Sequence, residues 1–584
     1  MHFMSEYAVH PSQLHAQFNV PETLILPQEH MKLLGQHTLT AALKLALKQQ
    51  TKLIKQHVFV LAEHDLLASE MLESYLKSSS KELETQWLVM QKVVTSTEYF
   101  WVEQEPIGKE KQVIVSQTPS YHLFDTLYTQ ANLFGRFVEK NDTSEFIPGA
   151  LFSYSVVILS LEQLAKHQFV WRKLLKSLTE GYVQINDKYP PLPINCLVVL
   201  EGDYEHFSYE QTVEPKFSQA FSLFTECHCE FKYHQDTVSS YHTWLATLAY
   251  TDDIELALDA YPVLMRYSST LVDHQQRLSL STLKMRQCIL QASLFSNTHV
   301  VNAKHIEQAL RYDQQQRGFS QQRSLENFID NFVHLQTNDQ IVGQINALTV
   351  IEDVHCIYGE PARVTATVHY GDGEVADIER KSDLGGNLHA KGMMILSACL
   401  YRIFGKDEAL HLNASIVFEQ SYQEIDGDSA SLAEYCALIS AISEVPIIQS
   451  LAVTGAIDQF GMVQAIGGVN EKIMGFFEIC RHRGLTGEHG VIIPESNVVQ
   501  LNLPKPILKA IETKNFHIYQ VKHVDEAIKL LTGEKPGEMD KYHFFPDETL
   551  YGKVQSRLAL LADSDHDEGN FLKRFFQRIA DFFG

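Results

Sequence analysis

IDGDSASLAEYCALISAIS, residues 425–443, joins a short polar turn to an apolar segment whose spacing predicts a helix. A serine beside the start of a helix faces backbone N–H groups that have no partner inside the helix. These groups can stabilise negative charge that develops on a nearby carbonyl oxygen. Ser429 is therefore a candidate nucleophile, and the alternative interpretation is that it only caps the helix.

A serine hydroxyl needs a base, and the segment GGVNEK at residues 467–472 offers one. This segment opens a second predicted helix, with Asn470 as its N-cap and Gly484 at its end. Lys472 then lies in the first turn, where the positive end of the helix dipole disfavours an ammonium group. Because burial or a positive field lowers the pKa of a lysine from about 10.4, Lys472 is a candidate base for Ser429. The alternative is a solvated surface lysine.

Longer segments around these residues carry a more specific pattern, and they are FEQSYQEIDGDSAS (418–431), QSLAVTGAIDQFGMVQAIGGVNEKIMGFF (449–477) and RGLTGEHGVIIPESNV (483–498). They resemble the proteolytic domain of the Lon protease family, in the branch that has DGDSAS around its serine. The resemblance begins near Ile341. It implies that Ser429 and Lys472 form a catalytic Ser-Lys dyad and that Thr454 hydrogen-bonds the lysine. It also matches Asp426 to an acidic residue near the dyad.

The N-terminal half contains an apolar run, HVFVLAEHD at residues 57–65, that predicts a buried strand. In P-loop proteins such a strand leads into a glycine-rich turn that ends in Gly-Lys-Ser or Gly-Lys-Thr and binds phosphates. Residues 62–69 contain neither glycine nor lysine, and none of the Gly-Lys pairs in the chain is followed by serine or threonine. The sequence therefore predicts no cradle for ATP and no bound cofactor.

Other segments of this half are ANLFGRF (131–137), FIPGALFSYSVVILSLEQL (146–164) and PLPINCLVVLEGDYEHF (191–207). They resemble the AAA+ module of the same Lon branch. A strand predicted at 156–159 is followed by Ser160, Leu161 and Glu162, where a Walker B strand would end in acids that hold magnesium. Since only Glu162 is acidic, we expect a degenerate AAA+ fold retained for assembly, substrate gating or docking. The alternative is an α/β domain of another purpose.

Length and composition limit the number of domains, the classes of partner and the location that the sequence allows. A chain of 584 residues is too long for one core and should contain two or three domains. Its net charge of −24 disfavours nucleic acid as a partner. The eight cysteines lie mostly in apolar runs, which indicates reduced thiols, and no second pair matches Cys227 and Cys229 to make a metal site. With no signal-peptide pattern and no long apolar run, a cytoplasmic location is expected.

The expected regions are an irregular, proline-containing arm at 1–30, a degenerate AAA+-like domain at 31–325, a proteolytic domain at 326–535, and an acidic linker with a C-terminal helix at 536–584. In the proteolytic domain, VTATVHYGDGEVADIER (364–380) predicts a hairpin and KGMMILSACLYRIF (391–404) a buried helix. The chain ends in FLKRFFQRIADFFG (571–584), which places phenylalanines and basic residues on opposite helix faces. This helix would contact its own assembly, a partner or an anionic membrane surface.

The predicted fold class is multidomain: a degenerate AAA+ α/β domain, an α+β Lon-type proteolytic domain and a short amphipathic C-terminal helix. The resemblance implies a serine endopeptidase that forms a homohexamer and cleaves unfolded proteins or peptides through Ser429 and Lys472, supported by Thr454 and Asp426. Without a phosphate cradle, no dependence on ATP is expected. The alternative hypothesis is a non-proteolytic assembly or adaptor protein with a vestigial protease site.

Overall fold

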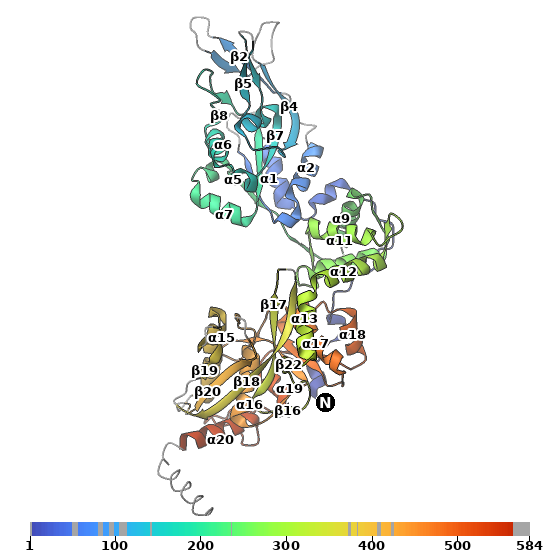
Figure 1. The fold of residues 1–584 in the computed structure, drawn as a ribbon, viewed down its shortest axis with the longest axis vertical. Helices are drawn as coiled ribbons and strands as arrows, with labels where there is room; N and C mark the ends of the chain where they lie inside the picture. Colours follow the sequence, from blue (N-terminus) through green and yellow to red (C-terminus); the bar gives the residue numbers. More distant parts are fainter. Residues whose placement is uncertain are drawn as a thin grey trace, which may run out of the picture. The chain divides into compact units, whose positions relative to one another are not determined.

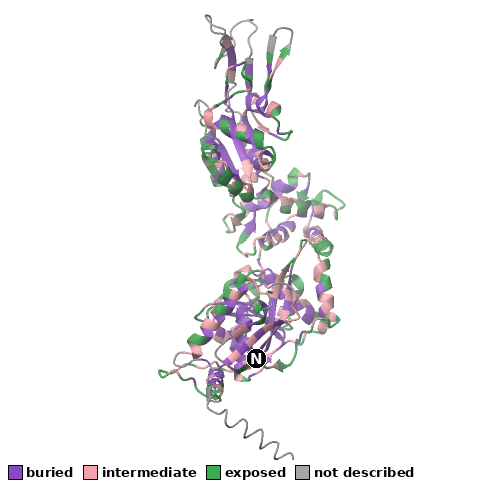
Figure 2. Cartoon of the chain, turned by 60° about the vertical axis from the view of Figure 1, so that its left-hand side comes forward, coloured by how far each residue is buried: buried purple, intermediate pink, exposed green. Residues whose placement is uncertain are grey.

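The computed structural model describes residues 3–48, 56–79, 86–92, 99–103, 114–140, 143–234, 236–354, 356–371, 375–381, 384–405, 410, 412–421 and 425–563. The described chain forms two compact units (Figure 1). The N-terminal unit contains residues 18–272 and 276–310. The C-terminal unit contains residues 1–17, the short stretch 273–275 and the chain from Arg311 onward. In each unit the buried residues gather along a central sheet and the exposed residues lie on the outer helices (Figure 2).

The N-terminal unit is built on a sheet with the strand order β11-β1-β10-β7-β4-β2-β3. Its strands are β1 (Val58–Leu61), β2 (Gln86–Lys92), β3 (Tyr99–Val102), β4 (Ile114–Leu123), β7 (Tyr154–Ser160), β10 (Leu197–Gly202) and β11 (Leu223–Glu226). Neighbours from β11 to β4 are parallel, and β2 and β3 add antiparallel pairings. The run VFVL in β1 is fully buried because its residues alternate between cores on the two faces of the sheet.

Helices cover both faces of this sheet, and a helical region follows it. The larger helices beside the sheet are α1 (His37–Leu47), α2 (Ala68–Ser79), α6 (Gln168–Glu180) and α7 (Tyr204–Val213). The helical region contains α9 (Val238–Thr251), α10 (Ala260–Thr270), α11 (Thr282–Ser293) and α12 (Ala303–Arg317). The strand expected at 57–65 is thus β1, and the strand expected at 156–159 lies within β7.

The C-terminal unit has a second sheet, with the order β19-β20-β18-β17-β22-β25-β26. Its strands are β17 (Gln344–Glu352), β18 (Ile357–Tyr370), β19 (Val375–Asp377), β20 (Leu412–Glu419), β22 (Leu451–Val453), β25 (Gly490–Pro494) and β26 (His517–Val521). Strands β17, β18 and β20 are antiparallel, whereas β17, β22, β25 and β26 are parallel. Strands β17, β22, β25 and β26 place residues in two apolar cores, one on each face, whereas β18 and β20 contribute to only one of these cores.

The helices of this unit separate onto the two faces of its sheet. One face carries α15 (Asn387–Phe404), α16 (Ser431–Ser443), α19 (Val524–Thr532) and α20 (Leu550–Asp563). The opposite face carries α13 (Phe319–Ile329), α17 (Val469–Arg483) and α18 (Lys505–Glu512). The helices predicted around Ser429 and Lys472, α16 and α17, therefore pack on opposite sides of one sheet.

The hairpin expected at residues 364–380 is wrong. Strand β18 ends at Tyr370 and pairs with β17 and β20, while β19 pairs in parallel with β20 on its far side. The reason is tertiary: β20 has an alternating apolar face of its own and takes the place beside β18 that the hairpin would have needed. Residues 372–374, in the expected turn, lie outside the described residues.

The ends of the chain also differ from the regions expected from the sequence. The expected arm at 1–30 is divided between the two units, with residues 1–17 in the C-terminal unit. These first residues are joined to β26, because Val9 N–H donates to the Ile518 carbonyl at 2.9 Å and Gln520 N–H donates to the Tyr7 carbonyl at 2.8 Å. Helix α20 lies in the expected linker region, yet it is packed into the core through Leu550, Tyr551 and Val554. The amphipathic segment 571–584 lies outside the described residues.

Candidate active site

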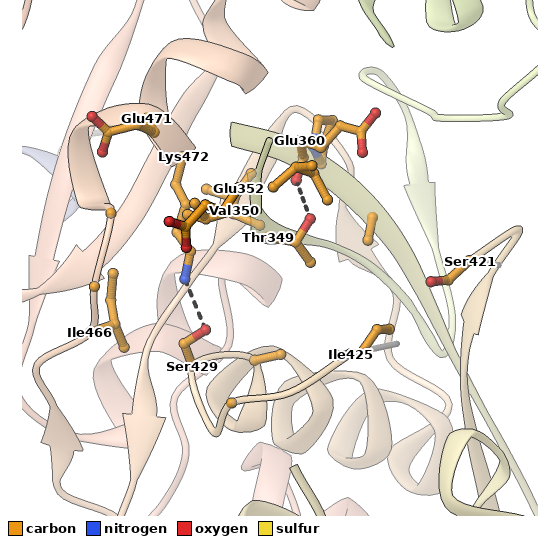
Figure 3. Close-up of a pocket in the computed structure, with 18 of the residues that line it drawn as sticks. Thr349, Val350, Glu352, Glu360, Ser421, Ile425, Ser429, Ile466, Glu471 and Lys472 are labelled. Carbon is orange, nitrogen blue, oxygen red and sulfur yellow. Dashed lines mark hydrogen bonds between the residues drawn. The ribbon is translucent and has the colours of Figure 1, made fainter. Parts of the chain in front are cut away.

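Ser429 lies in the turn that precedes α16, and it does not cap that helix. The helix begins at Ser431 with Ala430 as its N-cap, and the Ser429 hydroxyl instead accepts a hydrogen bond from Lys472 Nζ at 2.8 Å (Figure 3). Ser431 secures the turn, since its hydroxyl donates to the Asp428 carbonyl and accepts from Ile457 N–H. The turn thus presents Ser429 to a lysine 43 positions away in the sequence.

Lys472 reaches this hydroxyl from the first turn of α17. The helix begins after Gly468, whose φ of 64° is in the left-handed region that favours glycine. The prediction of Asn470 as N-cap is wrong, because its side chain instead accepts from Asn502 N–H and donates to the Gln500 carbonyl. The predicted end at Gly484 is confirmed. Lys472 is only 2% exposed, so the solvated surface lysine is also excluded for this conformation.

Two glycines let α17 approach β18 closely at the position of Lys472. A Cβ atom added to Gly475 would lie 2.1 Å from the Gly359 carbonyl oxygen, and one added to Gly359 would lie 2.1 Å from the Glu471 carbonyl oxygen. Real Cβ atoms essentially never come this close. The helix and strand backbones are therefore in direct contact one turn from Lys472, which fixes the depth at which its amine enters the site.

Thr454 links the two halves of the site. It follows directly after β22, is fully buried, and lies between the helices that pack on opposite faces of the sheet. Its hydroxyl accepts from Lys472 Nζ at 3.2 Å and donates to the Ser429 carbonyl at 3.2 Å. The N–H of Gly455 donates to the same carbonyl at 2.8 Å. The end of β22 thus holds both the amine and the backbone of Ser429.

The environment of Lys472 favours its neutral form. Burial lowers the pKa of its amine to about 8, because an ammonium group loses hydration inside the protein. The Asp428 carboxylate opposes this effect and raises the pKa. Burial, which was expected from the sequence beside the helix dipole, is thus the largest cause of the lowered pKa. Near pH 8 about half of the lysine is uncharged and able to accept a proton.

The two acidic residues of the turn, Asp426 and Asp428, have different contacts. The Asp426 carboxylate accepts from the N–H groups of Leu388 at 2.9 Å and His389 at 3.4 Å, and therefore caps the start of α15. It lines the same cleft as the Ser429 side chain. The residue that acts electrostatically on Lys472 is Asp428, which the sequence analysis did not single out. Its position directly before Ser429 was the available signal.

The hydroxyl and amine open into a cleft of about 1030 Å³. Its walls come from β17, β18, the turn before Ser429 and the start of α17. Many of the lining side chains are carboxylates, among them Glu352, Glu360 and Glu471 (Figure 3). A space of this size can hold an extended peptide segment against the Ser429 hydroxyl.

Backbone donors lie beside the same hydroxyl. The N–H groups of Ser431 and Leu432 donate to the carbonyls of Asp428 and Gly455 and are not free for a ligand. Within the described part of the chain, the N–H groups of Ser429 and Ala430 have no acceptor among the protein's own atoms. These two donors are therefore available to a negatively charged oxygen near Ser429 Oγ.

In the N-terminal unit, residues 62–69 follow β1, at the position where a P-loop would hold phosphates. The residues after β1 form a short 3-10 turn and then α2, and the N–H of Ser69 at the start of α2 donates to the Glu201 carboxylate from β10. Burial raises the pKa of Glu201 to about 7, while His64 and this N–H favour its charged form. Glu162 is paired with Lys166 at 2.7 Å. Glu201 and Glu162 thus each have a partner within the protein.

No group of three or more His, Cys, Asp or Glu side chains among the described residues is arranged to hold a metal ion. None of the eight cysteines, all of which are among the described residues, forms a disulfide bond. None of the described helices combines the length and the apolar character that crossing a bilayer requires.

Comparison with known proteins adds independent information. The Lon protease (S16) C-terminal proteolytic domain matches residues 404–533, and the LID domain of the archaeal LonB AAA+ ATPase matches residues 255–316. A protein named as a Lon protease homolog in Escherichia coli (strain K12) is 37% identical over 415 residues, which cover 68% of this chain and 70% of the relative. A second protein of that name, from Haemophilus influenzae, is 35% identical over 458 residues and 75% of each chain. An archaeal Lon protease from Methanocaldococcus jannaschii is 43% identical over 116 residues, 20% of this chain and 15% of that protein.

The proteolytic-domain match contains Ser429, Thr454 and Lys472, and the LID match falls on the helical region of the N-terminal unit. The chain is thus a multidomain protein of mixed α/β structure that contains a Lon proteolytic domain and an AAA+ LID domain. Since the E. coli and H. influenzae relatives are matched over more than two thirds of their length at 37% and 35% identity, the chain belongs to the Lon protease family.

Proposed function

We propose that this chain is a serine endopeptidase in which Ser429 and Lys472 form the catalytic dyad. The observation that carries the proposal is the 2.8 Å contact between a buried amine and a hydroxyl that opens into a large cleft. A pKa of about 8 makes this amine a usable base near neutral pH, whereas an ordinary lysine is almost entirely charged there.

In the first half of the reaction, neutral Lys472 accepts the Ser429 hydroxyl proton while Oγ attacks the scissile carbonyl carbon. The N–H groups of Ser429 and Ala430 donate to the oxygen that becomes negative. The protonated lysine then gives its proton to the leaving amine, and the acyl group stays on Ser429. Thr454 keeps the lysine directed at Oγ throughout, because its hydroxyl also bonds the Ser429 carbonyl.

The second half returns the enzyme to its starting state. Lys472, neutral again, accepts a proton from a water molecule that attacks the acyl carbonyl carbon. The bond to Ser429 Oγ then breaks, and the lysine returns its proton to Oγ as the acid product leaves. A single residue therefore serves as base and acid in both halves, which requires a pKa near the working pH.

Cleavage is proposed to be independent of ATP. The supporting observations are the absence of glycine and lysine at residues 62–69, the Glu201 carboxylate at the start of α2, and the Lys166 partner of Glu162. Substrates would then be unfolded proteins or short peptides, which need no mechanical pulling. The region 31–325 would act as a degenerate AAA+-like module for assembly or gating, ahead of a proteolytic domain at 326–535.

The resemblance to the Lon family further supports a cytoplasmic homohexamer whose active sites share a chamber. The amphipathic helix expected at 571–584, which lies outside the described residues, would contact this assembly, a partner or a membrane surface. The expected C-terminal region, 536–584, contains α20, which packs into the core of the C-terminal unit.

The function is tested with purified full-length protein and unfolded casein, with and without ATP and magnesium. Ser429→Ala and Lys472→Ala should each abolish cleavage, whereas Lys391→Ala, an exposed lysine on α15, should not. A fluorophosphonate probe should label Ser429. Large stimulation by ATP would contradict the degenerate-module proposal. Absence of both labelling and cleavage would instead favour the non-proteolytic adaptor.

A further inference from the structure

A cluster of buried charged residues lies behind the turn that carries Ser429. His389 on α15 is 2% exposed and Glu434 on α16 is 1% exposed, and they are joined by Asp377 at the end of β19. His389 Nε2 lies 3.2 Å from Asp377 Oδ2, and its Nδ1 lies 3.8 Å from Glu434 Oε1. Glu379 on α14 (Ile378–Lys381) adds a further buried carboxylate, which accepts from Phe418 N–H at 2.9 Å. The proposed reaction uses none of these groups.

The surroundings of His389 favour the charged imidazolium. Each ring nitrogen lies within ion-pair distance of a carboxylate oxygen, without hydrogen-bond geometry, and only the doubly protonated ring carries an N–H on both nitrogens. Burial by itself lowers the pKa of His389, but Asp377, Glu434 and Glu379 outweigh it and raise the pKa. Burial also raises the pKa of Glu434, and His389 opposes that rise. Unpaired charge at this depth would be costly, so the imidazolium and the carboxylates depend on one another.

This cluster is connected to the Ser429 turn from both directions along the chain. Before Ser429, Asp426 caps the start of α15 through the N–H groups of Leu388 and His389. A Cβ atom added to Gly392, one turn further along α15, would lie 3.2 Å from Asp428 Cβ, so Asp428 packs directly on the helix. After Ser429, the chain enters α16, whose first turn carries Glu434. Helix α15 therefore contacts the chain on both sides of the nucleophile.

We propose that His389 is a positioning residue for Ser429, because its ion pair with Glu434 ties α15 to α16 and so holds the intervening turn at the distance that Lys472 requires. The proposal rests on the proteolytic function proposed above. His389 touches neither substrate nor Oγ in this scheme. It acts through α15 and α16 on the turn that carries the hydroxyl, whereas Thr454 bonds directly to the amine and to the Ser429 carbonyl.

The test uses full-length His389→Gln, Glu434→Gln and the double variant, with His489→Gln as a matched control. His489 is another buried histidine of the C-terminal unit, 1% exposed, and its ring contacts the Thr337 carbonyl. Each protein is measured for its rate of fluorophosphonate labelling at Ser429, for kcat and KM on a quenched peptide, and for thermal stability.

His389→Gln should lower kcat and the labelling rate together by about 10- to 100-fold with KM unchanged, because a small displacement of a reacting group has an effect of this size. Glu434→Gln should lower both less, since Asp377 still pairs with the imidazolium. The double variant lacks both partners of the same ion pair and should therefore lose no more labelling than His389→Gln, instead of the product of the two single losses. His489→Gln should keep kcat, labelling and KM.

Wild-type labelling rates in His389→Gln would overturn the proposal. So would a loss in the double variant larger than in His389→Gln, or an equal loss in His489→Gln, because either result indicates general destabilisation. If His389→Gln does not fold, the proposal is tested by kcat and the labelling rate of Glu434→Gln instead, and wild-type values of both would overturn it. A wild-type protein that neither labels nor cleaves would refute the proteolytic function itself, which differs from a wild type that labels normally and variants that do so as well.

Discussion

The close contact between α17 and β18 gives the sharpest test of the geometry around Lys472. In Gly475→Ala, the new Cβ would start 2.1 Å from the Gly359 carbonyl oxygen, and ordinary contact begins at 3.4 Å. The helix must therefore move by about 1.3 Å away from the strand. Alanine favours a helix over glycine by about 1 kcal/mol, but overpacking of this kind costs about 1–3 kcal/mol.

This movement should reach the dyad because Lys472 lies less than one turn from Gly475. A shift of about 1.3 Å along the line from Nζ to Oγ would lengthen their 2.8 Å distance to roughly 4 Å, beyond hydrogen-bond range. We expect kcat on a quenched peptide to fall about 100-fold with a smaller change in KM. Fluorophosphonate labelling of Ser429 should slow in parallel.

His482→Ala is the matched control, since His482 is exposed near the other end of α17. It changes the helix without touching the strand and should keep both labelling and kcat. If Gly475→Ala has wild-type kcat, labelling rate and thermal stability, the contact does not position Lys472, and the reasoning from the Cβ distance is refuted. A crystal structure of the variant would then show where the methyl group fits.

Other expected outcomes concern protonation, support of the dyad and nucleotide. The value of kcat/KM should rise as pH increases through about 8, because the neutral amine of Lys472 is the base. Asp428→Asn should move this rise to lower pH, because it removes the charge that raises the pKa of Lys472. An unchanged midpoint in this variant would contradict the role of Asp428. Thr454→Ala should lower kcat about tenfold through loss of a hydrogen bond to a charged or reacting group, with Thr454→Ser retaining most activity; equal rates in both variants would exclude the hydroxyl. ATP with magnesium should leave the thermal unfolding midpoint unchanged, and a rise that increases with ATP concentration would show that nucleotide binds.

Local patterns were sufficient for many of the elements. The apolar spacing after Ser429 and Lys472 predicted helices that the structure places at α16 and α17, because a helix that buries one stripe must repeat its apolar residues along the chain. The run before residue 62 predicted β1 for the same kind of reason. The helical spacing of Leu550, Tyr551 and Val554 also indicates α20, a helix that the sequence analysis did not predict.

Local sequence patterns did not predict the contacts between segments that are distant in the chain. The partner of β18 depends on β20, the start of α17 on the conformation of Gly468, and the capping role of Asp426 on the position of α15. Each of these competes with a locally reasonable alternative. The ion pair of His389 and Glu434 likewise joins helices whose packing is decided only when the core forms.

By itself, the sequence determined which residues carry a hydroxyl, an amine and a supporting threonine, and which segments become strands and helices. Only the tertiary structure decided that the helices of Ser429 and Lys472 pack on opposite faces of one sheet and meet at the end of β22. It also buried the amine, and burial is what lowers its pKa to about 8. The physical reason is that desolvation and hydrogen-bond distance are properties of the packed core, whereas apolar periodicity and turn chemistry are properties of neighbouring residues.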